Sequence, residues 1–354
     1  MRATSFAPLS RRRERGWGRG GFWILLLTLV ATLAQARALQ VQSITLTVSD
    51  LGRAAAFYTG ALGFTETGRE LIAAKGHDLA VGVDGSRVLR ATLRLGDETL
   101  VLDQYLAPPG KAYPADSRAQ DRWFQHFAIV VSDMDKALAR LAPFAAQPIS
   151  HGHQTLPASN PAAAGIRAYK FRDPDGHPLE LLQFPADKGR ARWHAADGRL
   201  FLGIDHSAFT VADTEASLGF WRDLLGLRVA GGSLNTGLTQ ENLDGAPGAV
   251  VRVTGLRPDG EEGPGVEFLH YLAPTDGRPT PDDQRANDLA HARVVLEVDN
   301  LNDLAGRLQA RGRAVSGRVV CKPGDPYARR FMARDPDGHA VMLVQRSQPG
   351  ETCP

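Results

Sequence analysis

Imidazole and carboxylate groups are the side chains of this sequence best suited to metal binding or proton transfer, and it contains ten histidines. Two of them end the same hexapeptide, Arg-Asp-Pro-Asp-Gly-His, which occurs at 172–177 and again at 334–339. Asp-Pro-Asp-Gly is typical of a turn before a strand. We therefore expect His177 and His339 to lie at exposed turn ends and do not count them as ligands.

Two other features that could carry chemistry predict no reactive centre. His151-Gly152-His153 lies in a stretch rich in Pro, Ser and Asn, which predicts a solvated loop. Cys321 and Cys353 are the only cysteines. They could pair in an oxidising compartment, but two thiols do not make a disulfide framework.

The first 36 residues differ in composition from the rest of the chain. Basic residues up to Arg19 precede an apolar run over 22–33, and Ala34-Gln35-Ala36 follows. This order is typical of a cleavable secretory signal peptide, and the apolar run is short for a membrane span. We predict a signal peptide over 1–36 and an exported protein, either periplasmic or secreted. An uncleaved N-terminal anchor is the alternative.

Loss of this leader removes six arginines and one glutamate, which changes the formal charge from +2 to −3. The mature chain therefore has no basic excess that would favour nucleic acid, and nothing in it favours a membrane. Its composition, 43% hydrophobic and 23% charged, is that of a globular protein. A small molecule is the partner we expect.

The sequence after the leader is an internal duplication. Tyr-Leu-Ala-Pro occurs at 105–108 and 271–274, and the segment over 48–64 is matched over 211–227. We predict two domains, 39–188 and 200–346, followed by a C-terminal tail at 347–354. The aromatic pairs Phe57-Tyr58 and Phe220-Trp221 lie on predicted helices, and we interpret them as core.

Each half divides again, because a strand followed by a helix recurs midway through it. In the first copy, apolar and polar residues alternate over 43–48, which predicts a half-buried strand. Asp50 is placed to cap the next helix and Gly63 to end it in a left-handed conformation. Similar strands are expected over 126–131, 206–211 and 293–298, with three further strands after each helix.

This pattern resembles the vicinal-oxygen-chelate superfamily of glyoxalases, bleomycin-resistance proteins and extradiol dioxygenases. The resemblance rests on Val-Ser-Asp-Leu, a helix ending Phe-Tyr-x-x-x-Leu-Gly-Phe, and a late Asp-Pro-Asp-Gly-His before Leu-Glu-Leu, and it covers nearly all of 39–346. It implies an α+β fold in which four βαβββ modules form two curved, eight-stranded mixed sheets, each a cup with helices on its convex side. It does not specify the reaction, since members include lyases, isomerases, dioxygenases and metal-free binding proteins.

The resemblance also implies two metal-ligand positions in each module, one at the start of the first strand and one in the last strand. In the second and third modules these positions hold good ligands: His126, Glu180, His206 and Glu267. In the outer modules they hold poor ones: Ser43, Val101, Arg293 and Met342. Imidazole and carboxylate ligands suit a divalent ion such as Zn, Ni, Mn or Fe(II).

Two pairings of the modules are open. If the second pairs with the third, as in the monomeric four-module glyoxalase I enzymes that this ligand set resembles, the four ligands form one site. If neighbours pair, as in extradiol dioxygenases, the second half offers His206, Glu267 and His291 as an Fe(II) triad. Met342, in place of a glutamate, counts against that triad. Metal-free ion pairs within each module are a third arrangement.

The leading hypothesis is a metal-dependent, glyoxalase-like lyase or isomerase acting on a small vicinally oxygenated molecule. Glu180 or Glu267 would move the proton. Export argues against glutathione as cosubstrate, because that thiol is mainly cytoplasmic. The alternatives are a ring-cleaving dioxygenase, a metal-free small-molecule binding protein of the bleomycin-resistance type and a noncatalytic scaffold.

Overall fold

A computed structural model of the protein describes residues 36–195, 197–260, 262–321 and 326–347. Residues 1–35 of the predicted leader and Cys353 lie outside these residues, so the signal peptide, the export and the pairing of the two cysteines stay predictions. Within the described ranges, no helix is both long enough and apolar enough to cross a membrane.

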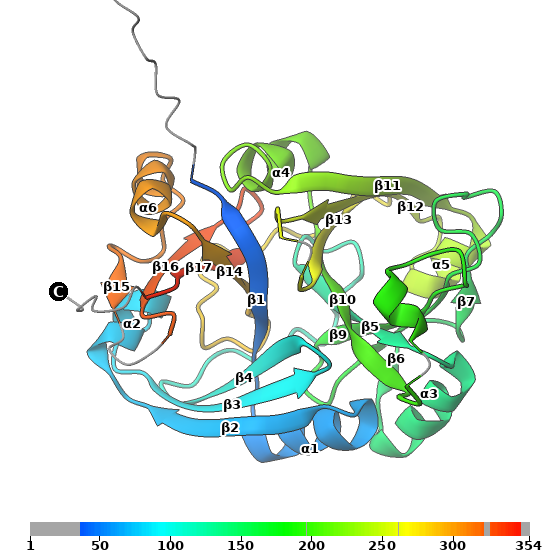
Figure 1. The fold of residues 1–354 in the computed structure, drawn as a ribbon, viewed down its shortest axis with the longest axis horizontal. Coiled ribbons are helices and arrows are strands. Elements are labelled where there is room, and N and C mark those ends of the chain that lie inside the picture. The colour runs from blue at the N-terminus through cyan, green and yellow to red at the C-terminus, as the bar shows by residue number, and fades with distance from the viewer. Residues whose placement is uncertain (1–35, 196, 261, 322–325, 348–354) are drawn as a thin grey trace, which may run out of the picture. The chain divides into compact units, whose positions relative to one another are not determined.

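The four modules follow one another along the chain, coloured from blue to red in Figure 1. The first contains β1 (Ala38–Thr47), α1 (Leu51–Leu62), β2 (Thr65–Ile72), α2 (Lys75–Val81), β3 (Arg87–Leu95) and β4 (Glu98–Ala107). The second contains β5 (Phe124–Val131), α3 (Met134–Leu141), η1 (Ala142–Phe144), β6 (Gln147–Pro148), β7 (Gln154–Thr155), β8 (Arg167–Arg172) and β9 (Pro178–Gln183).

The second half repeats this order after a short 3-10 helix, η2 (Ala191–His194). The third module contains β10 (Phe201–Thr210), α4 (Thr214–Trp221), β11 (Arg228–Thr236), α5 (Leu238–Asp244), β12 (Val250–Arg257) and β13 (Gly265–Ala273). The fourth contains β14 (Ala292–Val298), α6 (Leu301–Ala310), β15 (Val320–Cys321), β16 (Arg329–Arg334) and β17 (Ala340–Gln345). The helices α2 and α5 were not predicted from the sequence.

The sheets pair modules from opposite halves of the chain. One sheet has the order β15-β16-β17-β14-β1-β4-β3-β2 and joins the fourth module to the first. The other has the order β11-β12-β13-β10-β5-β9-β8-β6, with β7 paired to β8, and joins the third module to the second. The pairing of neighbouring modules is therefore wrong. The predicted domain boundaries, 39–188 and 200–346, follow the repeat along the sequence, and they stay a prediction.

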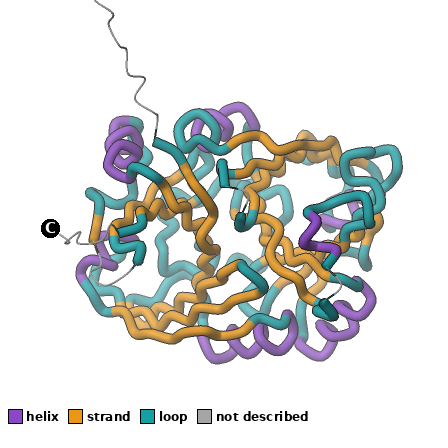
Figure 2. The backbone as a smooth tube through the Cα atoms, viewed as in Figure 1, coloured by secondary structure: helices purple, strands orange, loops and turns teal. Residues whose placement is uncertain are grey.

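The two faces of each sheet have different partners, because successive side chains of a strand point to opposite faces. On β5, Phe127, Ile129 and Val131 join one apolar core that also contains buried residues of α1, α3, α4 and α6 and strands of both sheets. His126 and Ala128 point to the other face. The helices lie mainly outside the strand layers in Figure 2, as the fold class predicted.

Local signals at the first helix behave as the sequence predicted. Asp50 accepts a hydrogen bond from the Arg53 backbone N–H at 2.8 Å, and Gly63 has φ 72°, the left-handed conformation that glycine adopts without strain. The expected apolar face is buried, and so are both aromatic pairs: Leu51, Ala54, Ala55, Phe57, Tyr58, Leu62, Phe220 and Trp221.

The histidines that end the two Asp-Pro-Asp-Gly-His turns are buried, so the expectation that His177 and His339 are exposed was wrong. The Asp173 carboxylate accepts hydrogen bonds from His177 Nδ1 at 2.8 Å and from the Tyr58 hydroxyl of α1 at 2.9 Å. In the other half, Asp335 takes the same bonds from His339 and from Trp221 of α4. Each turn thus holds the helix of the neighbouring module, which the turn signal alone does not reveal.

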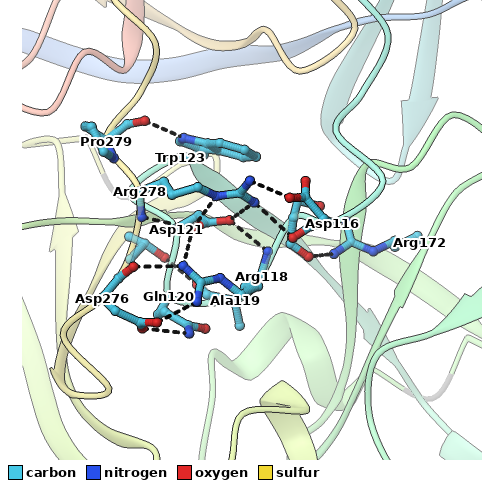
Figure 3. A network of polar contacts seen from close by, with 12 residues as sticks. Asp116, Arg118, Ala119, Gln120, Asp121, Trp123, Arg172, Asp276, Arg278 and Pro279 are labelled. Atoms are coloured by element: carbon cyan, nitrogen blue, oxygen red, sulfur yellow. Dashed lines mark hydrogen bonds and ion pairs between the residues drawn. The ribbon is translucent and has the colours of Figure 1, made fainter.

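Two long connections, 108–123 and 274–291, bind the halves to each other. Figure 3 shows the polar network between them, in which Arg278 Nη2 donates to Asp121 at 2.6 Å and Nη1 to Asp116 at 2.8 Å. Arg118 Nη1 donates to Asp276 at 2.6 Å, and the Trp123 indole donates to the Pro279 carbonyl at 3.0 Å. The connections lie so close together that a Cβ atom at Gly110 would be 1.8 Å from the Asn287 carbonyl oxygen.

This close approach predicts that Gly110→Ala destabilises the protein by about 3 kcal/mol, because a backbone carbonyl would have to move. Gly219→Ala, in the exposed middle of α4 with no atom within 4 Å of its added Cβ, is the control and should stabilise by roughly 0.5–1 kcal/mol. Chemical denaturation of both variants measures the difference. Equal stabilities would contradict the contact.

Candidate metal centre

The candidate site is built around the antiparallel pairing of β5 with β10. In this register His206 of β10 lies opposite Ala128 of β5, and Ala208 lies opposite His126. Each histidine therefore faces a small side chain across the strands. The two imidazoles can meet over the sheet without displacing a larger residue.

Parallel strands on either side add the carboxylates. In β9, Glu180 pairs with Ala128, and in β13, Glu267 pairs with Ala208. One histidine and one glutamate thus come from each module, and the crossed sheet brings all four side chains predicted as ligands to one face. This face lines a cavity of about 160 Å³ that contacts all four.

The distances among these groups are short. His126 Nε2 lies 3.2 Å from His206 Nε2 and 3.0 Å from Glu180 Oε2. His206 Nε2 lies 4.0 Å from the same Glu180 oxygen and 3.6 Å from Glu267 Oε1. His126, His206 and Glu267 offer ligand atoms that all lie within 4.8 Å of one another, which makes them a candidate metal-binding triad.

Outer carbonyl and carboxylate oxygens orient both imidazoles. His126 Nδ1 contacts the Gln125 side-chain oxygen, and His206 Nδ1 lies 3.1 Å from Asp205 Oδ2. An oxygen accepts a hydrogen bond there, so Nδ1 carries the proton and the Nε2 lone pair points inward. Trp193 in turn donates to Asp205 at 3.0 Å. Gln125 and Asp205 have no sequence signal beyond their place next to the histidines, and Trp193 has none.

With both tautomers fixed in this way, the inward-facing atoms are four acceptors, namely two imidazole nitrogens and two carboxylates. Acceptors at these distances repel one another unless a cation lies among them, either a proton or a metal ion. Two imidazoles and two carboxylates are also a suitable ligand set for Zn, Ni, Mn or Fe(II). The residues therefore fit a divalent metal.

Proton affinities differ sharply within the site. Burial is the largest influence on His126 and lowers its pKa to about 4, whereas Glu267, Asp205 and Glu180 outweigh burial at His206 and raise its pKa to about 9. At neutral pH, His126 is thus neutral, and His206 holds the proton when no metal is bound.

The two carboxylates are also unequal. Burial raises the pKa of Glu267 above its ordinary value. At Glu180, burial acts in the same direction, but His126 and the ammonium of Lys170 outweigh it and lower the pKa to about 2. Glu180 is therefore held ionised, and Glu267 is the carboxylate more able to take up a proton.

Lys170, which the sequence did not predict, is a buried charge that lines the same cavity beside Glu180. Its Nζ lies 2.7 Å from Asp244 Oδ1 at the end of α5. Asp244 also accepts hydrogen bonds from the Tyr271 hydroxyl at 2.5 Å and from Gln240 at 2.6 Å. The helix α5 thus closes one end of the cup and fixes the cation that keeps Glu180 ionised.

A second cavity, of about 320 Å³, adjoins the candidate metal centre. It is lined by residues of β10, β11, β12 and β13 and by the loop near residue 162. Asp205, His206 and Glu267 line both cavities. Arg257 contributes a positive charge to the second. The space is of the order that holds a small organic molecule.

The alternative Fe(II) triad is wrong in its geometry. His291 directly precedes β14, which belongs to the other sheet, whereas His206 and Glu267 lie on β10 and β13. His291 is fully buried, and its backbone carbonyl accepts a hydrogen bond from the Thr47 backbone N–H of β1.

His153, in the loop predicted to be solvated, accepts a hydrogen bond from Arg167 at 2.7 Å and is outside the site.

The other cup has the same register with different side chains. On one side, Arg293 of β14 lies opposite Thr45 of β1, and Thr45 pairs with Val101 of β4. On the other side, Ser43 of β1 lies opposite Val295 of β14, and Val295 pairs with Met342 of β17. The four positions predicted to have lost their ligands thus also meet in one cup, and all four line one cavity. Within the part of the chain described by the structure, this cup contains no cluster of metal-ligand groups.

Comparison with known proteins now gives the family. The model of the Glyoxalase/Bleomycin resistance protein/Dioxygenase superfamily matches residues 40–181 and 203–343. The chain belongs to this superfamily. The match covers both halves of the duplication, as the resemblance in the sequence predicted.

Solved structures agree on the fold. Glyoxalase I from Zea mays is 17% identical, covers 86% of this chain and 92% of its own, and has a TM-score of 0.56. A putative dioxygenase from Bacillus subtilis is 14% identical, covers 88% of this chain and 86% of its own, and has a TM-score of 0.52. At these identities the likeness concerns the fold alone. No curated protein matches the chain significantly.

The raised pKa of His206 predicts how stability depends on pH in the presence of a chelator. The imidazole binds its proton up to about pH 9 in the folded protein, against about 6.5 when unfolded. Its contribution is therefore fully present below pH 6.5 and is lost as the pH rises to 9. The unfolding free energy of wild type minus that of His206→Gln should fall over this range. A constant difference would contradict the assigned proton.

Proposed function

We propose that this protein is a metal-dependent enzyme of the superfamily, acting on a small molecule with oxygens on adjacent carbons. The observation that carries the proposal is the convergence of two oriented imidazoles and two carboxylates at the floor of a cavity. We assign His126, His206, Glu180 and Glu267 as the metal ligands. The metal would supply Lewis-acid activation of the two substrate oxygens.

Glu267 is the better candidate for the proton-transferring group. Its side chain is 23% exposed toward the cavities, against 6% for Glu180, and burial raises its pKa. A carboxylate of raised pKa accepts a proton from a carbon acid more readily at neutral pH. Glu180, held ionised by Lys170, would keep its charge through the reaction. The sequence left undecided which glutamate moves the proton. The difference in exposure and pKa between them favours Glu267.

A glyoxalase-like isomerisation suits these groups, because it needs one carboxylate to remove a proton from one carbon and return it to the next. Arg257 and the glycine-rich wall at 231–232 would position the rest of the substrate in the second cavity. The predicted leader favours an exported protein, and hence a substrate other than a glutathione adduct. Ring cleavage by a dioxygenase is the competing activity, which the His126, His206 and Glu267 triad would also suit.

Elemental analysis tests the metal. We expect the purified mature protein to contain about one divalent ion per chain, and the His126→Ala/His206→Ala variant to retain less than a tenth of it, because both nitrogen ligands are lost. His151→Ala, an exposed loop histidine, is the matched control and should retain the full amount. If wild type neither contains metal nor binds added Zn, Ni, Mn or Fe(II), the site is a metal-free ion pair and the protein a small-molecule binder.

Activity of the metal-loaded protein tests the reaction. A 2-oxoaldehyde with a small thiol should give a thioester, followed by absorbance, and a catechol under oxygen tests ring cleavage in parallel. Glu267→Gln should lower kcat by about 10²- to 10⁴-fold, since the proton acceptor is removed. The surface control Glu215→Gln should not change it. Unchanged turnover in Glu267→Gln would reject this glutamate as the base.

A further inference from the structure

The cup formed by the first and fourth modules contains a larger cavity than either one at the candidate metal centre. Its volume is about 530 Å³, within the usual range of small-molecule sites. The strands β1, β3, β4, β14 and β17 line it, and α2 contributes His77 at one end. A sheet that served only as structural support would be expected to fill this face with apolar side chains.

Two guanidinium groups lie on the floor of this cavity, of which that of Arg293 is buried and that of Arg90 is half-buried. Arg90 donates to both oxygens of Asp103, at 2.7 and 2.8 Å, and Arg293 Nη2 donates to Asp103 Oδ2 at 2.7 Å. Asp103 is fully buried and Arg293 is 3% exposed. Two guanidinium groups thus share a single carboxylate, which leaves one positive charge uncompensated within this trio.

The floor has a buried donor that no carboxylate accepts from. Among the described residues, Arg293 Nη1 makes no hydrogen bond of good geometry, and the Tyr105 hydroxyl is a further polar group that interacts with Arg293. A buried charged donor without a well-placed acceptor costs free energy, which favours a ligand oxygen at this position. In the register, Arg293 holds the position that His126, a candidate metal ligand, holds in the other cup.

The walls are also basic. Arg94 and Arg330 line the cavity, and among its described lining residues Glu70 alone carries a carboxylate. His77 adds no charge, because burial, with a smaller effect of Arg90, lowers its pKa to about 3. Met342 and Val344 give the cavity an apolar side. The site therefore combines a positive floor with an apolar wall.

We propose that this second cup binds a small organic anion, whose carboxylate or phosphate oxygens are held by Arg293 and Arg90 and whose apolar part lies against Met342 and Val344. Guanidinium groups match the planar pair of oxygens that such anions present. The proposal does not depend on a metal in the other cup, nor on the reaction proposed there.

Isothermal titration with three probes tests the proposal: hexanoate, the uncharged hexanamide and inorganic phosphate. With the full mature protein in a chelator, we expect hexanoate to bind at least tenfold more tightly than hexanamide. Phosphate binding as tight as that of hexanoate would assign the site to phosphate compounds, and weaker phosphate binding to carboxylates. No binding of either anion, or equal binding of hexanoate and hexanamide, would overturn the proposal.

Variants locate the binding. Arg293→Met should weaken anion binding at least tenfold, and so should Met342→Glu, which places a competing carboxylate in the cavity that Arg293 lines. Arg257→Met, an arginine in the cavity of the other cup, should leave it unchanged. If Arg293→Met does not fold, as judged by circular dichroism, Met342→Glu tests the location of the site instead, because it retains the guanidinium groups of Arg90 and Arg293. Affinity kept in Met342→Glu, or lost in Arg257→Met, would overturn the assignment.

Discussion

The antiparallel pairing of β5 with β10 is the interaction on which the candidate centre depends. It joins modules from opposite halves and fixes a register in which Ala128 faces His206 and Ala208 faces His126. Because successive side chains alternate between faces, a shift of one residue would turn one histidine toward the helices and bury it in the apolar core. The parallel partners β9 and β13 carry Glu180 and Glu267 in matching register, so the whole ligand set follows from this one pairing.

Contacts of two kinds connect the modules. The sheets join the halves, because they unite the first module with the fourth and the second with the third, whereas the turns at Asp173 and Asp335 each hold the helix of the neighbouring module within one half. The polar network between 108–123 and 274–291 also joins the two halves. Neither half can complete a sheet by itself, and so the centre forms only when both halves have folded. This explains why the two halves of the duplication do not each form a cup of their own.

The sequence predicted the features that depend on local pattern. The first strand of each module, the Asp50 cap, the Gly63 terminus and the burial of the aromatic pairs are set by periodicity and turn chemistry, which act over a few residues, although β1 and β10 begin five residues earlier than predicted. What it missed depends on contacts between distant segments. Lys170 and Asp244 are charged residues that would be expected at the surface, and only the closure of α5 over β8 buries them together. His177 looks like the end of an exposed turn until Tyr58 is packed on Asp173. The supporting carboxylate of Asp205 has no motif of its own.

The two cups share a register but differ in the charge that they require. In one, imidazoles and carboxylates meet as acceptors, and their mutual repulsion is relieved by a cation. In the other, Arg293 occupies a ligand position and brings a fixed positive charge to the floor, with Asp103 shared between it and Arg90. A divalent ion there would be repelled, so the loss of ligands in the outer modules has not produced an inert copy. The same backbone instead presents a cation to whatever enters the cavity, and electrostatics in a partly desolvated cup then selects an anion.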